Sequence, residues 1–209
     1  MKKLISFIIS MAMCLSFTAC GSNNEPQQTQ PVQSDVLVRS GYNEIDGSYY
    51  NSYTQLTITP PGDWYIYRDS DLAASYLGGE VTGDELSVWG TAEFAQQTVI
   101  PDIAFMDMAN NNSLSVVYVN LDKLEGDAAA DEKACHALVI SHLSKEGKVL
   151  NQTDDEIVTL GDEEFYLFSF KGADSNCYMA MRKQENYMIV ITATDRTAAG
   201  KEMFLGFIG

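Results

Sequence analysis

Histidine and cysteine are scarce in this chain. The 209 residues include two histidines, His136 and His142, and four cysteines. Imidazole and thiolate are common groups in nucleophilic catalysis and common zinc ligands. A chain with so few of them can form few sites of either kind. The sequence also lacks a Gly-rich phosphate loop, a G-x-S-x-G motif and an H-E-x-x-H motif. We therefore expect no enzyme activity, no cofactor and no metal site.

Long apolar runs are also scarce, and the longest is at the N-terminus, from Leu4 to Phe17. It is shorter than the roughly 20 residues that span a bilayer. Lys2 and Lys3 precede the run, and the small residues of Thr18-Ala19-Cys20 follow it. This order of basic, apolar and small residues is typical of a secretory signal. We expect residues 1–19 to be a signal peptide that is removed.

The end of that segment, Phe17-Thr18-Ala19-Cys20 followed by Gly21, resembles the lipobox of bacterial lipoproteins, with Phe17 where leucine is usual. The resemblance implies a diacylglyceryl group on Cys20, which becomes the first mature residue. One acyl chain holds a protein to a membrane only marginally, whereas two hold it stably. We expect a lipid anchor in a bacterial cell membrane, with the domain on the extracytoplasmic side. Plain secretion with an incidental cysteine is the alternative.

The segment after the cysteine contains little that could form a core. Residues 21–35 include two prolines, four glutamines, one valine and no aromatic residue. Too little apolar surface is present to offset the entropy of ordering. We interpret residues 20–35 as the lipidated cysteine and a flexible tether with a reach of roughly 20 Å. Residues 36–209, which show no internal repeat, are long enough for a single globular domain.

Basic residues are few, with 13 Lys and Arg against 29 Asp and Glu. Removal of Lys2 and Lys3 with the signal leaves 11 basic residues and a net charge of about −18. A field of this sign repels phosphate backbones and anionic lipid heads. Nucleic acid binding is therefore disfavoured, and membrane contact should come from the lipid on Cys20.

Several stretches alternate or run apolar in ways that predict β-strands. Residues 55–59 have one apolar face, and residues 101–121 read as a β-hairpin that reverses at Asn110-Asn111-Asn112. Three more strands start near residues 164, 176 and 186, with short gaps that predict an antiparallel meander. Because most of these strands are apolar on both faces, both faces of the sheet need cover.

Helices are the predicted cover. The longest runs from about residue 128 to 146, with Asp127 as its cap and Gly147 after its end. Shorter helices are expected at residues 69–78 and 197–207. The predicted fold class is α+β, an antiparallel sheet with helices on both faces.

The order of these elements is similar to the PsbP-like and Ran-binding Mog family of α/β/α sandwiches. The similarity covers most of residues 41–208: a Tyr- and Asn-rich lead, a one-sided strand, a turn with Pro60, Gly62 and Trp64, a hairpin, a long helix and a meander closed by a helix. It implies the fold and a tendency to bind or scaffold partners. No functional residue is carried over, because the family shares no common site.

The mature chain has two cysteines besides Cys20, namely Cys135 and Cys177. Cys135 and His142 are two helical turns apart, about 10 Å along the axis, and His136 points about 100° away from Cys135. Neither spacing favours a thiolate–imidazole pair, so we interpret Cys135 and His142 as packing residues. A Cys135–Cys177 disulfide is the main alternative and would stabilise by roughly 4 kcal/mol. A nucleophilic cysteine and a metal site at Cys135, Cys177 and His142 are weaker alternatives.

Aromatic side chains near the start of the domain are a possible ligand surface. The set includes Tyr49, Tyr50, Tyr53, Trp64 and Tyr65. Large amphipathic rings suit contact with carbohydrate or protein. Packing of the first strands is the alternative, and we favour it.

These observations predict a membrane-anchored cell-envelope lipoprotein, a non-catalytic binding or scaffolding module for an unknown envelope protein or carbohydrate. A hydrolase or thiol enzyme at the cell surface is one alternative. A calcium-binding surface protein is another, because acidic stretches occur at 69–71, 83–87 and 153–156, although none has the spacing of an EF-hand loop.

Overall fold

A computed structural model describes the main elements of the domain. The described residues are 47–67, 71–72, 98–124, 129–145, 151–152, 155–172 and 174–209. The predicted signal peptide, Cys20, the tether, the acidic stretch 83–87 and most of the predicted helix 69–78 lie outside them. Within the described part, no helix has the length and apolar character needed to cross a membrane.

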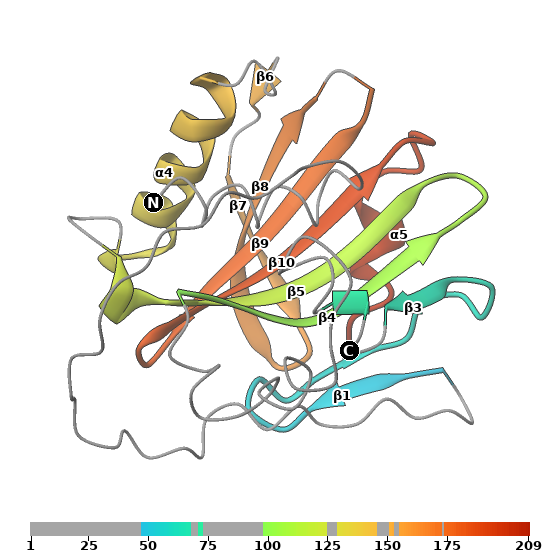
Figure 1. The fold of residues 1–209 in the computed structure, drawn as a ribbon, viewed down its shortest axis with the longest axis horizontal. Helices are drawn as coiled ribbons and strands as arrows, with labels where there is room; N and C mark the ends of the chain where they lie inside the picture. Colours follow the sequence, from blue (N-terminus) through green and yellow to red (C-terminus); the bar gives the residue numbers. More distant parts are fainter. Residues whose placement is uncertain are drawn as a thin grey trace.

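The centre of the domain is an eight-stranded antiparallel sheet (Figure 1). The strands follow one another in the order β3-β4-β5-β10-β9-β8-β6, and β7 also pairs with β8. The strands are β3 (Tyr65–Tyr67), β4 (Val99–Asp107), β5 (Asn112–Asn120), β6 (Asn151–Gln152), β7 (Glu156–Leu160), β8 (Glu163–Lys171), β9 (Asn176–Gln184) and β10 (Tyr187–Asp195).

The predicted hairpin and meander are confirmed. β4 pairs with β5 around a turn in which Asn111 has a φ of 58°, as the asparagine run predicted. The carboxylate of Asp107 holds this turn by accepting hydrogen bonds from the backbone N–H groups of Ala109 and Asn110, each 3.0 Å long. β8, β9 and β10 pair in sequence order. β10 is buried at all nine positions, as a strand covered on both faces should be.

One long helix covers one face of the sheet. α4 (Glu132–Lys145) packs Cys135, Val139 and Leu143 into a cluster with residues of β5, β8, β9 and β10. The helix begins four residues later than predicted. Asp131 Oδ1 accepts a hydrogen bond of 2.8 Å from the backbone N–H of Ala134, the contact expected of an N-cap side chain, so the cap is Asp131 rather than Asp127.

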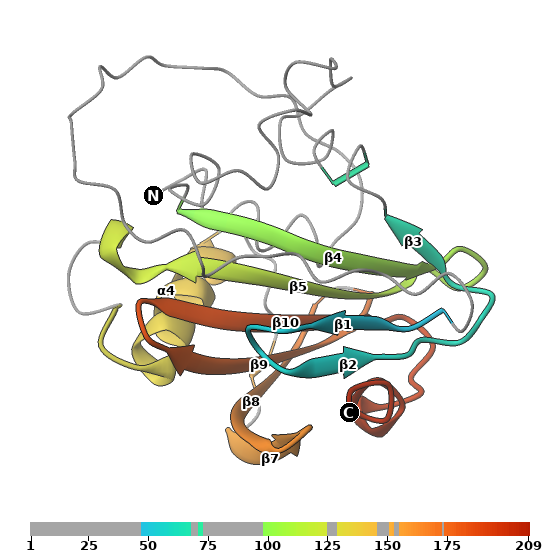
Figure 2. The same cartoon turned by 90° about the horizontal axis from the view of Figure 1, so that it is seen from below.

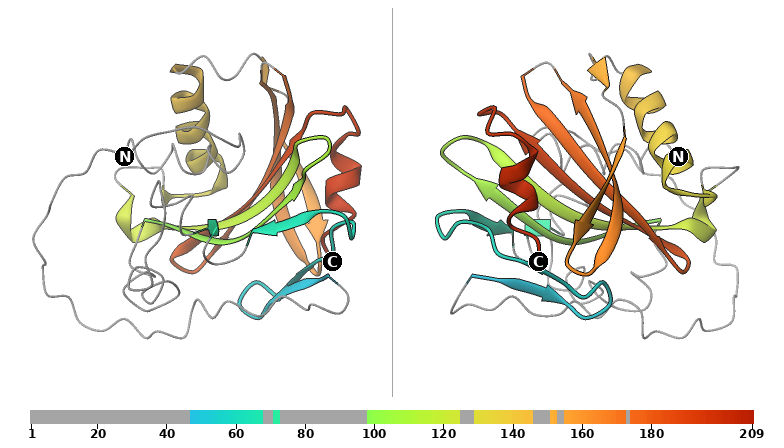
Figure 3. Two further views of the ribbon diagram at one scale, coloured as in Figure 1. Left: turned by 45° about the vertical axis from the view of Figure 1, so that its right-hand side comes forward. Right: turned by 180° about the vertical axis from the view of Figure 1, so that it is seen from behind.

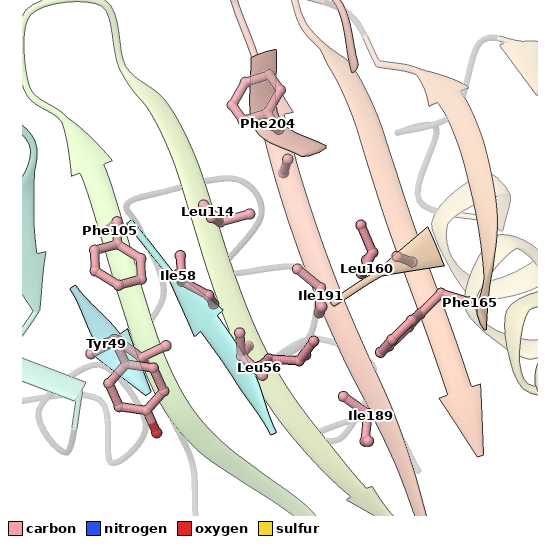
Figure 4. Close-up of a cluster of buried hydrophobic side chains, with 14 of the residues drawn as sticks. Tyr49, Leu56, Ile58, Phe105, Leu114, Leu160, Phe165, Ile189, Ile191 and Phe204 are labelled. Atoms are coloured by element: carbon pink, nitrogen blue, oxygen red, sulfur yellow. The ribbon is translucent and has the colours of Figure 1, made fainter. Parts of the chain in front are cut away.

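A two-stranded sheet covers the opposite face, where the prediction had helices. β1 (Tyr49–Asn51) and β2 (Leu56–Ile58) pair antiparallel. Figure 3 shows α4 and β1 on opposite sides of the large sheet. Figure 4 shows the hairpin's side chains against the sheet: they are Tyr49, Leu56 and Ile58, among Phe105, Leu114, Phe165, Ile189 and Ile191.

The C-terminus completes this second layer (Figure 2). The predicted helix 197–207 is the shorter α5 (Lys201–Leu205), which places Phe204 in the same cluster as the hairpin. The last residue, Gly209, exchanges backbone hydrogen bonds with Thr57 of β2. The described part of the chain is therefore an α+β fold, mostly antiparallel sheet with one main helix, and it shows no long helix on the second face.

A buried carboxyl group joins the β1–β2 hairpin to the large sheet. Asp102 lies at a register shift of β4, between Pro101 and Ile103, and is 1% exposed. It accepts hydrogen bonds from the hydroxyl of Tyr118 at 2.7 Å, from Asn51 Nδ2 at 3.0 Å and from the hydroxyl of Tyr49. Because Tyr49 and Asn51 belong to β1 and Tyr118 to β5, the carboxylate holds both layers together.

Removal of one of these donors should destabilise the domain. We expect Tyr49→Phe to lower the free energy of unfolding by about 1 to 3 kcal/mol, because it removes a donor from a buried carboxyl oxygen. Tyr50, the next residue of β1, is 45% exposed, so Tyr50→Phe should change it by less than about 0.5 kcal/mol. Urea unfolding of both variants measures the difference. Equal effects would show that the Asp102 contact does not hold the hairpin.

Candidate functional site

A groove of about 460 Å³ lies beside α4 and β8, and we call it the α4 groove. Three of its residues, Lys133, Ala137 and Ser141, are four positions apart on α4, so they form one exposed row along the helix. Two of them are small, which leaves the space above the buried residues open. The lining is Lys133, His136, Ala137, Ile140, Ser141, Asp155 and Phe168.

His136 is the buried polar group of this groove. Its ring stacks on Phe168 of β8, with 3.8 Å between the centroids and 9° between the planes, and the residue is 4% exposed. Burial lowers the pKa of His136 to about 4, although the nearby Asp155 carboxylate acts in the opposite direction. The imidazole is therefore neutral at pH 7. Its Nε2 atom has no hydrogen-bond partner among the described residues.

An ion pair lies at the rim of the α4 groove. Lys133 Nζ is 2.6 Å from Asp155 Oδ2, and the two side chains are 61% and 36% exposed. The hydrogen bond between them raises the pKa of Lys133 and lowers that of Asp155. Lys133 Nζ also lies 5.4 Å from the centroid of the Tyr166 ring. Because these two charges compensate each other and the imidazole is neutral, the lining of the groove carries no net charge.

The two cysteines of the domain are packing residues in the structure. Cys135 and Cys177 are 2% and 0% exposed, belong to the same apolar cluster and are free thiols, so the alternative disulfide is not formed. Burial, with a smaller effect of Glu132, raises the pKa of the Cys135 thiol to about 11. Burial also raises the pKa of Cys177, although hydrogen bonds from Ser175 and Thr194 act against it. A thiol in this state is a poor nucleophile at pH 7.

No group of three or more His, Cys, Asp or Glu residues in the described part of the chain could hold a metal ion. The side chain of His142, one member of the alternative site at Cys135, Cys177 and His142, lies outside that part.

The predicted aromatic surface is divided by the fold. Tyr49 and Trp64 are 4% and 9% exposed, and the Trp64 ring packs edge-on against Phe204 and Phe207 of the C-terminal segment. For Tyr49 and Trp64 the structure agrees with packing, the alternative that the sequence favoured, because their rings cover the sheet.

The other members of the set differ in exposure. Tyr53 is half-buried, and its hydroxyl donates to the backbone oxygen of Gln184 at 3.1 Å. Tyr50 and Tyr65 are 45% and 46% exposed, and Tyr65 donates to Asp71 Oδ2 at 2.9 Å. Of the five predicted residues, Tyr50 and Tyr65 thus retain large exposed rings.

Sequence reasoning did not identify His136 as a site residue. It considered His136 only as a partner for Cys135, whereas the groove depends on Phe168 and Asp155, which are distant along the chain. The available signal was the row of Lys133, Ala137 and Ser141 on α4, where small residues take positions that usually carry long polar side chains.

The burial of the thiols predicts slow alkylation of the folded chain. At a pKa of about 11, Cys135 has a thiolate population roughly 300-fold lower than an exposed cysteine of pKa about 8.5. We expect iodoacetamide at pH 7.5 to leave Cys135 and Cys177 unlabelled in the native chain and to label both after denaturation without reductant, as read by peptide mass spectrometry. Rapid native labelling of Cys135 would favour a thiol enzyme, and a lack of label after denaturation would indicate a disulfide.

Comparisons with known proteins return a structural similarity. Neither a protein-family model nor a curated protein sequence matches the chain. The chain is similar in structure to a solution structure of cyanobacterial PsbP (CyanoP) from Synechocystis sp. PCC 6803. The TM-score is 0.45 and the sequence identity 11%, over 78% of this chain and 90% of that chain. The similarity concerns the fold, and no residue or role is transferred from it.

Proposed function

We propose that this chain is a membrane-anchored lipoprotein of the bacterial cell envelope, whose domain binds a ligand or partner without catalysis. The observation that carries the binding role is the α4 groove with His136 at its base. A buried polar atom without a hydrogen-bond partner, such as His136 Nε2, is uncommon in native proteins and calls for an explanation. A bound molecule that supplies the missing hydrogen bond is such an explanation.

The groups in the groove favour binding over hydrolysis. Ser141 is the hydroxyl group of the lining, but His136 Nε2 makes no hydrogen bond to it. An imidazole with a pKa of about 4 is also a weak general base at neutral pH. A serine nucleophile needs a base within hydrogen-bond reach, and His136, the imidazole of the described lining, does not provide one to Ser141.

The anchor rests on the residues before the domain. The lipobox-like Phe17-Thr18-Ala19-Cys20 and the polar residues after it support lipidation of Cys20, with residues 1–19 as the signal peptide. The lipid then provides the contact with the membrane, since the acidic domain is repelled by anionic lipid heads. The partner in the envelope is a protein or a carbohydrate, and the domain is on the extracytoplasmic side.

Site-specific photo-crosslinking in intact cells tests this function. A benzophenone amino acid replaces the exposed Ala137 at the rim of the groove, in the full chain produced in its own bacterial host. We expect the chain in the membrane fraction, and adducts with an envelope protein or glycan after illumination, because a bound partner covers the groove.

Two controls make the result specific. The same amino acid at Glu202, an exposed residue of α5 on the other side of the sheet, should give no such adduct. Cys20→Ala should release the chain from the membrane fraction, whereas Cys14→Ala, within the predicted signal, should not. Equal adducts from positions 137 and 202, or none from position 137, would contradict the binding role. Membrane retention of Cys20→Ala would contradict the anchor.

A further inference from the structure

The groups that line the α4 groove limit the charge of a ligand that fits it. A carboxylate ligand would find its cation, Lys133, already 2.6 Å from Asp155, and an amine ligand would find Asp155 occupied in the same way. Either ligand would have to break that ion pair and leave one of its members without a partner. The net charge of −16 for the whole chain adds a general repulsion of anions.

The lining of the α4 groove also indicates which apolar and hydrogen-bonding groups a ligand should have. Ala137, Ile140 and the edge of the His136–Phe168 stack provide apolar surface. His136 Nε2, in a residue 4% exposed, lacks a hydrogen-bond partner, and Ser141 adds a hydroxyl group at the exposed side. The volume of about 460 Å³ is within the range of small-molecule sites.

We propose that the α4 groove binds an uncharged amphipathic group of the envelope partner, whose flat apolar body lies along Ile140 and Ala137 and whose single polar head, an amide or a hydroxyl group, hydrogen-bonds to Nε2 of His136. This inference rests on the proposed binding function and adds the chemical class of the ligand. The neutral state of the imidazole at pH 7 agrees with it, since a neutral ring does not attract a counter-ion.

In this mode of binding, the residues of the α4 groove have different roles. The stack of His136 on Phe168 holds the imidazole in place before the ligand arrives, which reduces the cost of ordering on binding. The hydrogen bond to Nε2 selects for a polar head, because a ligand without one leaves the buried nitrogen unpaired. The Lys133–Asp155 pair stays intact and selects against charged heads.

Four probes of similar size separate these requirements: benzamide, toluene, benzoate and benzylamine. The full mature lipidated chain is placed in phospholipid nanodiscs, and the methyl resonances of Ile140 report binding by NMR at pH 7. We expect saturable shifts with benzamide, and affinities about tenfold lower for toluene, which leaves Nε2 unpaired. Benzoate and benzylamine should also bind more weakly than benzamide, by up to about fivefold, because each must disrupt the exposed ion pair.

His136→Phe is the matched variant, because a phenyl ring can keep the stack on Phe168 while the nitrogen is lost. In this variant the preference for benzamide over toluene should fall to about one, and unchanged methyl resonances in the free variant would show that the groove is intact. Benzoate or benzylamine binding as tightly as benzamide, an unchanged preference in His136→Phe, or no saturable shift with benzamide would overturn the proposal.

The outcomes also distinguish this inference from the proposed function. Crosslinks from position 137 without a benzamide preference would mean that the groove binds a partner of another chemical class. The absence of both crosslinks and probe shifts would remove the binding role itself.

Discussion

The second layer of this domain depends on one buried carboxyl group. Asp102 is 1% exposed and would be costly to bury without partners, but Tyr49, Asn51 and Tyr118 donate hydrogen bonds to it. Two of these donors belong to the β1–β2 hairpin, so the docked position of the hairpin is the one that satisfies the buried oxygens. The docked hairpin covers the apolar face of the sheet. Thr57 of β2 then exchanges backbone hydrogen bonds with Gly209.

Buried polar groups differ in how completely they are satisfied, and two side-chain atoms, His136 Nε2 and Arg182 Nη1, have no hydrogen-bond partner among the described residues. Asp195 is 0% exposed, and its carboxylate accepts hydrogen bonds from the backbone N–H groups of Thr197, Ala199 and Gly200, so it has a complete structural role in shaping the segment before α5. His136 is buried to a similar extent, but its Nε2 has no partner in the described part of the chain. His136 is one of the residues that line the α4 groove, whereas Asp102 and Asp195 do not line it. This difference is the physical basis of the binding role proposed for α4 and β8.

Sequence patterns predicted the elements whose residues carry a regular period. The β4–β5 hairpin, the β8–β10 meander and α4 were found because their apolar residues recur over nine or more positions. The strand at residues 55–59 was also found from its alternation and is β2, but its partner β1 and the position of the two strands as cover on the second face were not, because β1 has only three residues. The packing role of Cys135 was found from its place on the dry face of α4. Asp102 was not found, because its donors come from distant strands, and the α4 groove was missed for the same reason.

The central claim is that His136 is held neutral and that its Nε2 atom has no hydrogen-bond partner in the described part of the chain. The most direct measurement is a pH titration of its ring nitrogens by ¹⁵N NMR, with His136→Phe used to assign the signals. The account predicts a neutral ring at pH 7 that takes up a proton only near pH 4, since burial disfavours the charged form. Protonation near pH 6.5, the value of an exposed imidazole, or the signature of a hydrogen bond from Nε2 to a protein group, would contradict it.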